Sequence, residues 1–217
     1  MRNAALVRSA SLVLTAGLSP ALAGAAGPAP AAASAPTPQD LAFARTACDS
    51  ASRHPTLAPV EIDMAVRDTI AAIEDAVRSA EDLDKAGPLL DALQARVGDL
   101  DAVPSTELQL LRATLAAQSG DEVARMRYRT LSTALFTVLV GDGDGTTPET
   151  AFKPCMIPNE YAFVRRVLQA EVTGQSLVHV EDRHYDRLEV TFPDGTKRGF
   201  FFDVTDLFTR NAAAFDR

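Results

Sequence analysis

The spacing of apolar residues changes once along this chain, at the glycine-rich stretch GDGDGTTPETA of residues 141–151. Before this stretch the apolar residues recur every three or four positions, which is the period of an amphipathic helix. After it they alternate with polar residues or form short apolar runs, as strands do. We therefore expect an α+β protein, with antiparallel helical hairpins over residues 39–140 and a small antiparallel sheet covered by a helix over residues 141–217.

The first region shows the helical period most clearly in residues 61–80, where charged residues separate apolar residues that step by three or four. These are Ile62, Val66, Ile70, Ile73 and Val77. Gly87-Pro88, Pro104-Ser105 and Ser119-Gly120-Asp121 then interrupt the pattern, and each precedes another periodic segment. Helices joined by such short breaks pack as antiparallel hairpins, and Asp121 is placed to cap the last of them.

The second region predicts one helix and three strands. The helix is expected at residues 160–170, and the strands at residues 175–180, 185–192 and 199–204. Pro193-Asp194-Gly195 predicts a tight turn between the last two strands. The aromatic residues of this region suit either a ligand platform or the core of the sheet, and the area that an aromatic side chain buries favours the core. They are Tyr161, Tyr185 and Phe200 to Phe202.

The N-terminus has the features of a cleavable export signal. Two arginines precede an apolar run over residues 9–18, and Ala21-Leu22-Ala23 supplies the small-residue pattern that a signal peptidase recognises. The run is shorter than the ~20 residues needed to span a bilayer. We expect residues 1–23 to be a signal peptide and residues 24–38 to be an Ala/Pro-rich linker. The mature protein is then periplasmic or secreted, with no stable membrane anchor.

Charge limits the partners of such a protein. The chain has 21 basic and 29 acidic residues, a formal net charge of −8. Binding to nucleic acid relies on clustered Lys and Arg, so we expect no nucleic-acid partner. An envelope protein or a peptide is the partner class that remains.

The two cysteines, Cys48 and Cys155, form an even pair. In an oxidising compartment they predict a disulfide that closes a loop of about 100 residues and joins the helical region to the second region. The alternative is two separately buried thiols, because sequence does not show whether the two Cα atoms come within bridging distance.

The GDGDG stretch is best interpreted as a turn. A calcium loop of the EF-hand type that starts at Asp142 has Lys153 where the bidentate glutamate belongs, and one that starts at Asp144 has Cys155 there. A phosphate-binding loop needs a lysine that this stretch lacks, and its two aspartates repel phosphate. Glycines at left-handed turn positions remain, and Gly141 is predicted to end the preceding helix.

One polar cluster suggests metal chemistry. His179 and Glu181 face the same way on a strand, and a turn after them brings His184 near, which makes these three residues candidate ligands for a divalent metal. The alternative is a solvated hairpin turn. Ser176 and Asp186 with a histidine lack the sequence motif of a nucleophile elbow, so no catalytic residue is predicted.

The hairpin of residues 110–131 resembles a tetratricopeptide unit, with Gly120-Asp121 at the turn and Ala124 and Tyr128 beyond it. A second copy with the same residues does not follow, so the helical region is expected to be a simple bundle or a tetratricopeptide-like array. The resemblance implies a groove that binds a peptide or a partner helix.

A second resemblance covers residues 138–208. GDGDGTTPETAF, NEYAFVRRVL, GQSLV, HYDRLEV and FFFDVTDLF, in this order, resemble the secreted bacterial domain-of-unknown-function family numbered forty-nine nineteen. The departures are Asn159, where the family often has an acidic residue, and Phe201, where it more often has tyrosine. This resemblance implies export and a shared fold, and it brings no established activity.

Two functions follow from these observations. We expect a non-catalytic, exported binding or assembly module that needs no cofactor. The alternative is a divalent-metal-dependent hydrolase that uses His179, Glu181 and His184, in which the metal activates water.

Overall fold

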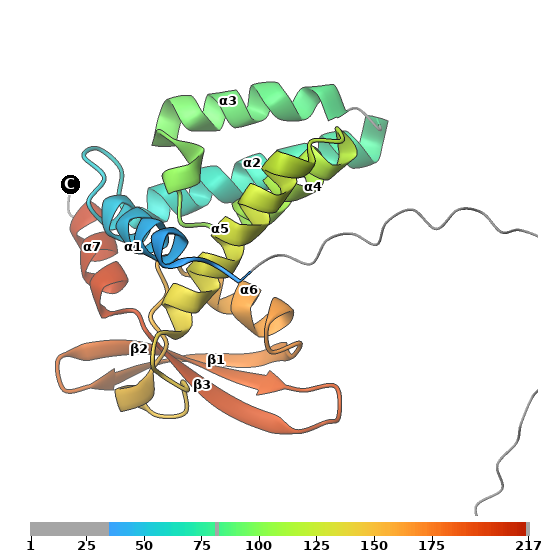
Figure 1. Cartoon of the computed structure of the whole chain (residues 1–217). Helices are drawn as coiled ribbons and strands as arrows, with labels where there is room; N and C mark the ends of the chain where they lie inside the picture. The colour runs from blue at the N-terminus through green and yellow to red at the C-terminus, as the bar shows by residue number, and fades with distance from the viewer. Residues whose placement is uncertain (1–34, 81–82, 216–217) are drawn as a thin grey trace, which may run out of the picture. The chain divides into compact units, whose positions relative to one another are not determined.

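The computed structural model describes residues 35–80 and 83–215, all within one compact unit of the chain. The predicted signal peptide, residues 1–23, and most of the predicted linker, residues 24–38, lie outside these described residues. All the labelled helices lie on the same side of the sheet (Figure 1), which confirms the α+β class. The elements run in the order α1 (Pro38–Ser52), α2 (Pro59–Ala80), α3 (Ala86–Val97), α4 (Thr106–Gln118), α5 (Glu122–Val140), α6 (Pro158–Arg166), β1 (Glu171–Val180), β2 (Arg183–Thr191), β3 (Lys197–Asp203) and α7 (Thr205–Phe215).

The helices α2 to α5 form the two antiparallel hairpins that the sequence breaks predict. The Asp121 carboxylate accepts a hydrogen bond from the backbone N–H of Ala124 at 2.9 Å and so caps α5. Gly141 has a φ of 54° and its N–H donates to the carbonyl of Thr137 at 3.0 Å, so α5 ends at the predicted glycine. None of the described helices is both long and apolar enough to cross a membrane.

A first hydrophobic core lies between α2, α3 and α4. The apolar stripe of α2 points into it, and Leu93 of α3 and Leu108 of α4 complete it. Ile62 and Val66, four residues apart, are both almost fully buried in this core. The spacing of apolar residues in the sequence therefore marks the face of α2 that packs against α3 and α4.

A second core lies between the sheet and the helices above it. It is rich in aromatic side chains: Phe152, Phe163, Phe200 and Phe202 pack against one another with ring centroids 5.0 to 6.4 Å apart. Phe200 and Phe202 thus belong to the core, as predicted. Leu139 from the end of α5 is part of the same cluster, which joins the helical region to the sheet.

The sheet is an antiparallel meander in the order β1-β2-β3. Its register pairs Leu177 with Asp186 and His179 with His184 across β1 and β2. Since alternate residues of a strand share a face, these four side chains lie on the same face as Leu188, which the helices cover. β1 starts at Glu171, four residues earlier than predicted, and the register shifts near Gly174.

Two helical segments differ from the prediction. The helix expected at residues 160–170 ends at Arg166, because the chain turns at Gln169, which has a φ of 54°. The helix α7 follows β3 directly and was not predicted. Its start is marked by Asp203, whose carboxylate accepts a hydrogen bond from the N–H of Thr205 at 3.2 Å.

The GDGDG stretch is a turn that covers the edge of β3. Asp144 accepts hydrogen bonds from the N–H of Thr146 at 2.9 Å and from the hydroxyl of Thr150 at 2.6 Å, and these bonds lower its pKa to about 2. The carbonyl of Gly145 accepts from the N–H of Phe201 at 2.7 Å. The backbone of Phe152 bonds to the same strand, so an otherwise open edge is protected.

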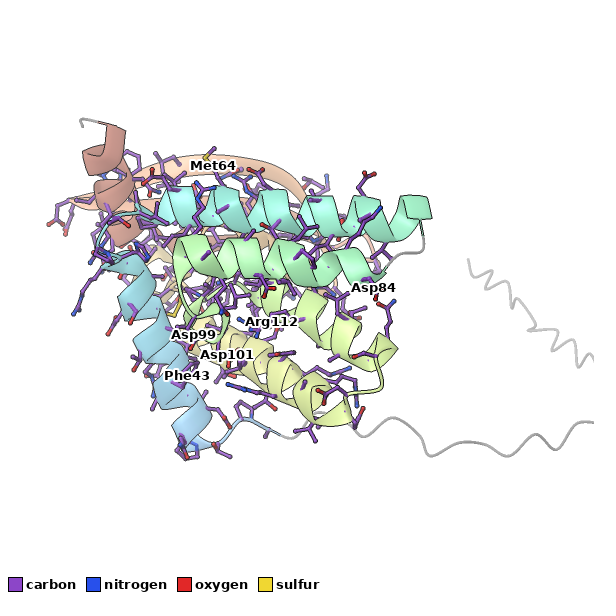
Figure 2. The ribbon with its side chains drawn as sticks, turned by 90° about the horizontal axis from the view of Figure 1, so that it is seen from above. Phe43, Met64, Asp84, Asp99, Asp101 and Arg112 are labelled. Carbon is purple, nitrogen blue, oxygen red and sulfur yellow. A yellow bond between two sulfur atoms is a disulfide. The ribbon has the colours of Figure 1, made fainter. Side chains whose placement is uncertain are left out.

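Cys48 of α1 and Cys155, just before α6, are joined by a disulfide with Cα atoms 5.0 Å apart. Inside the helical region the buried carboxylate of Asp101 forms two ion pairs. One carboxylate oxygen lies 2.7 Å from a guanidinium nitrogen of Arg112 on α4, and the other pairs with Arg127 of α5. Figure 2 shows Asp101 and Arg112 side by side between the helices.

Candidate functional site

A groove of about 920 Å³ opens on the helical region. Its floor is apolar, with Ile70 and Ile73 from α2 and Leu110, Leu111 and Leu115 from α4. Ile73 is fully buried, whereas the three leucines are partly exposed. The leucines belong to the hairpin of residues 110–131, whose sequence resembles a tetratricopeptide unit.

Arginines line the rim of this groove. Arg125 pairs with Glu122 at 2.5 Å, and Glu107 pairs with Arg165 at 2.5 Å. Arg129 and Arg166 are exposed, and among the described residues neither forms a salt bridge. The rim of the groove therefore offers positive charge in a protein whose net charge is negative.

A second hollow of about 380 Å³ lies over the sheet between α6 and α7. Its walls are mainly apolar: Ile157 precedes α6, Leu177 lies on β1, and Val204 and Phe208 come from the start of α7. Among the lining residues that the structure describes, Asp186 of β2 is the one that is charged. The volume is in the range of small-molecule sites, and an apolar wall with few polar groups is their usual lining.

Asp186 is in contact with a second buried acid. Glu160 of α6 is 0% exposed, and neither of its carboxyl oxygens has a hydrogen-bond donor among the described residues. Burial raises the pKa of Glu160 well above its ordinary value, and the adjacent Asp186 carboxyl adds to the shift. Burial also raises the pKa of Asp186, against the opposing hydrogen bonds from Gln175 and Glu160. Two carboxyl groups in contact share one proton, because ionising both would place two negative charges side by side in a buried site, which costs free energy.

Polar and aromatic side chains surround this acidic pair. The Tyr161 hydroxyl donates to the side-chain carbonyl of Gln175, and burial followed by the two nearby acids raises the pKa of Tyr161. On the other side, the His184 ring stacks on Phe208 with centroids 4.2 Å apart. The acids thus lie between a tyrosine on α6 and a histidine-aromatic stack at α7.

The structure brings two of the predicted metal ligands together. The rings of His179 and His184 lie side by side, with centroids 4.5 Å apart. Glu181 is exposed at the tip of the hairpin, where its φ is 55°. Over residues 35–80 and 83–215, no group of three His, Cys, Asp or Glu side chains is placed to hold a metal ion.

Ser176 and Asp186, which together with a histidine would make up a catalytic triad, lie on opposite faces of the sheet. Ser176 pairs with Arg187 and is exposed, whereas Asp186 pairs with Leu177 and points to the helix-covered face. A hydrogen-bonded relay between Ser176 and Asp186 is therefore impossible in this fold.

The Glu160–Asp186 pair was not predicted from the sequence. The signal available was the position of Glu160 on the apolar face of its helix, at helical spacing from Phe163 and Val164. A buried glutamate at such a position marks either a functional carboxyl or a fully hydrogen-bonded one. The sequence does not show that Asp186 is its neighbour.

Together these features define an α+β protein that combines a grooved helical region with a helix-covered three-stranded sheet. The chain belongs to the family described as a domain of unknown function, DUF4919, which matches residues 77–212, more than half of its length. This match is longer than the resemblance over residues 138–208 and includes α3, α4 and α5. No match was found among curated proteins or among solved structures.

Proposed function

We propose that this protein is an exported binding module whose helical groove holds an amphipathic segment of an envelope protein. The observation that carries the proposal is the groove of α2 and α4, with its partly exposed leucine floor and its arginine rim. Grooves of this kind bind helices through apolar residues spaced at i, i+3, i+4 and i+7.

The dimensions of the groove suit a short helix. The α2 residues that line it extend from Ile70 to Val77, and the α4 residues extend from Glu107 to Gln118. At 1.5 Å per residue the α2 wall is about 10 Å long and the α4 wall about 16 Å, or two to three turns of a partner helix. Such a partner places two or three apolar side chains on the floor.

The charges of the rim select the partner. Arg129 and Arg166 lack ion pairs within the described residues, so a segment with acidic side chains beside its apolar stripe gains charge-assisted contacts. Of the two acidic lining residues, Glu107 is paired with Arg165, and Glu74 forms no salt bridge in the described part of the chain. The charge of Glu74 offsets only one of the two arginines, so the rim keeps an excess of positive charge.

Export is supported by the disulfide as well as by the N-terminal sequence. Bridges between cysteines form and persist in the periplasm and outside the cell, and they are rare in the cytosol. Expression of the full chain in a Gram-negative host should yield a periplasmic or secreted protein that starts near Gly24. A protein that keeps Met1 and stays in the cytoplasm would contradict export.

The binding proposal is tested with a pair of synthetic peptides. Both carry leucines at helical spacing, and one has flanking glutamates where the other has lysines. We expect the acidic peptide to bind more tightly, as measured by fluorescence anisotropy. The Arg129→Glu/Arg166→Glu variant should weaken acidic-peptide binding by roughly tenfold or more, which corresponds to ~1.4 kcal/mol, and should favour the lysine peptide.

A matched control separates the groove from general charge effects. Arg198→Glu changes an exposed arginine on β3, where it lies over Phe192, far along the chain from the groove residues. This variant should bind both peptides as the original protein does. Equal binding of the two peptides, or an equal effect of Arg198→Glu, would show that the groove does not select an acidic helix.

A further inference from the structure

The cavity over the sheet is separate from the groove, since the two have no lining residue in common. The cavity adjoins a pair of buried carboxyl groups that have no basic partner among the described residues. Asp186 lines this cavity and is 7% exposed, and Glu160 lies behind it with no hydrogen-bond donor to its oxygens among the described residues, so its contact is the proton that it shares with Asp186. Among the described residues, no basic side chain forms a salt bridge with either acid.

The mouth of the cavity is apolar. Leu177 is 54% exposed and Phe208 is 44% exposed, although both are large hydrophobic side chains. Leu177 is the direct cross-strand neighbour of Asp186, so an apolar surface begins next to the buried carboxyl. A ligand that fits both features has a cationic end and an apolar body.

We propose that this cavity binds a small organic amine, with its ammonium group paired to Asp186 and its apolar body against Leu177 and Phe208. The ammonium group supplies the positive charge that the Glu160–Asp186 pair lacks among the described residues, and it adds charge-assisted hydrogen bonds to those that Asp186 already accepts from Gln175 and Glu160. The aromatic ring of Phe208 lies at the mouth of the cavity, and the face of such a ring attracts a cation.

Other ligand chemistries fit less well. A carboxylate or phosphate ligand would be repelled by the Asp186 carboxyl. A neutral apolar ligand would remove the remaining water from Asp186 without offering it a donor, which costs free energy. A primary amine on a short hydrocarbon body meets both requirements, and the cavity of about 380 Å³ has room for it.

The test compares n-butylamine with n-butanol and butyrate, which have similar apolar bodies and different head groups. Thermal unfolding of the intact protein is followed as each compound is added. A ligand that binds only the folded state raises the midpoint with concentration. We expect butylamine alone to raise it. An equal shift with butanol, or no shift with butylamine, would overturn the proposal.

Two variants locate the effect. Asp186→Asn removes the anion with little change of shape, and it should abolish the shift caused by butylamine. Leu177→Lys places an ammonium group beside Asp186 from an exposed position that does not disturb the core. It should raise the unfolding midpoint by itself and remove the response to butylamine.

The matched control is Asp182→Asn, which neutralises an exposed aspartate at the tip of the same hairpin. It should keep the full response. If Asp182→Asn lost the response, or if Leu177→Lys retained it, the amine would bind elsewhere on this acidic protein and the proposal would be wrong.

Discussion

The side chain of Asn159 holds the start of α4 through Thr106, 53 positions away in the sequence. Its carbonyl oxygen accepts hydrogen bonds from the backbone N–H and the hydroxyl of Thr106, both at 3.2 Å, and its amide nitrogen donates to the carbonyl of Pro104 at 2.7 Å. Asn159 is 2% exposed, so these bonds are shielded from water. One amide thus connects the helical region to α6.

We predict that Asn159→Ala lowers the free energy of unfolding by roughly 1–3 kcal/mol, because it leaves buried backbone groups without partners. Chemical denaturation measures the change. Thr106→Val removes only the hydroxyl and keeps the backbone bond, so it should cost less. An equal loss in the two variants would mean that the hydroxyl bond, and not the link between the two elements, is what matters.

The disulfide should contribute strongly to stability. Cys48 and Cys155 are 107 positions apart, and for a loop of about 100 residues the chain-entropy estimate is ~4.7 kcal/mol. We predict that Cys48→Ser/Cys155→Ser lowers the unfolding midpoint by about 9–19 °C, at roughly 2–4 °C per kcal/mol for a domain of this size. A reducing agent should lower the midpoint of the original protein and leave the variant unchanged. A midpoint insensitive to reduction would refute the contribution.

The turn at the edge of β3 has no room for a Cβ atom at two glycines: at Gly143 it would clash with the carbonyl of Thr150, and Gly145 is the second. Gly145 has a φ of +70°, and a Cβ atom there would clash with the ring of Phe152. Gly195 has a similar φ of +82° with open space around it. We predict that Gly195→Ala costs about 1–2 kcal/mol through the backbone alone, whereas Gly145→Ala costs about 1–3 kcal/mol more through overpacking. Urea unfolding of both variants measures the difference, and equal losses would contradict the clash.

The Glu160 carboxyl should make stability depend on pH. Its pKa is raised above the ordinary value of 4.5, so the folded protein binds this proton more tightly than the unfolded chain does. The stabilisation from the proton is complete below pH 4.5 and is lost as the pH rises through the pKa of the folded state. The contribution of Glu160 to stability therefore falls as the pH rises above 4.5.

Glu160→Gln cannot ionise and keeps a donor for Asp186. We predict that its unfolding midpoint, relative to that of the original protein, rises with pH above 4.5, because the original protein loses the stabilising proton of Glu160 and the variant does not. Differential scanning calorimetry across this range measures it. Glu181→Gln, at the exposed hairpin tip, should follow the original protein at every pH. A difference between Glu160→Gln and the original protein that stays constant with pH would refute the role of the proton.

The sequence by itself determined the local structure of this protein. Helical spacing placed α2 to α5, and alternation placed β2 and β3, because each period reflects one face that the element buries. Gly141 and Asp121 set helix ends through backbone geometry and capping, which act within a few residues. The start of α7 was missed because its capping residue, Asp203, lies inside the predicted strand of residues 199–204.

The tertiary structure alone decided the sites. Asp186 lies next to Glu160 only because β2 passes under α6, and the cavity beside them exists only because α7 folds back over the same face. The groove likewise needs α2 and α4 side by side. The metal-ligand hypothesis placed His184 near His179, as the structure does, but it put Glu181 on the strand, whereas β1 ends at Val180 and Glu181 lies in the turn. Period and capping are short-range properties of the chain, whereas the neighbours of a buried charge depend on contacts between elements distant in sequence.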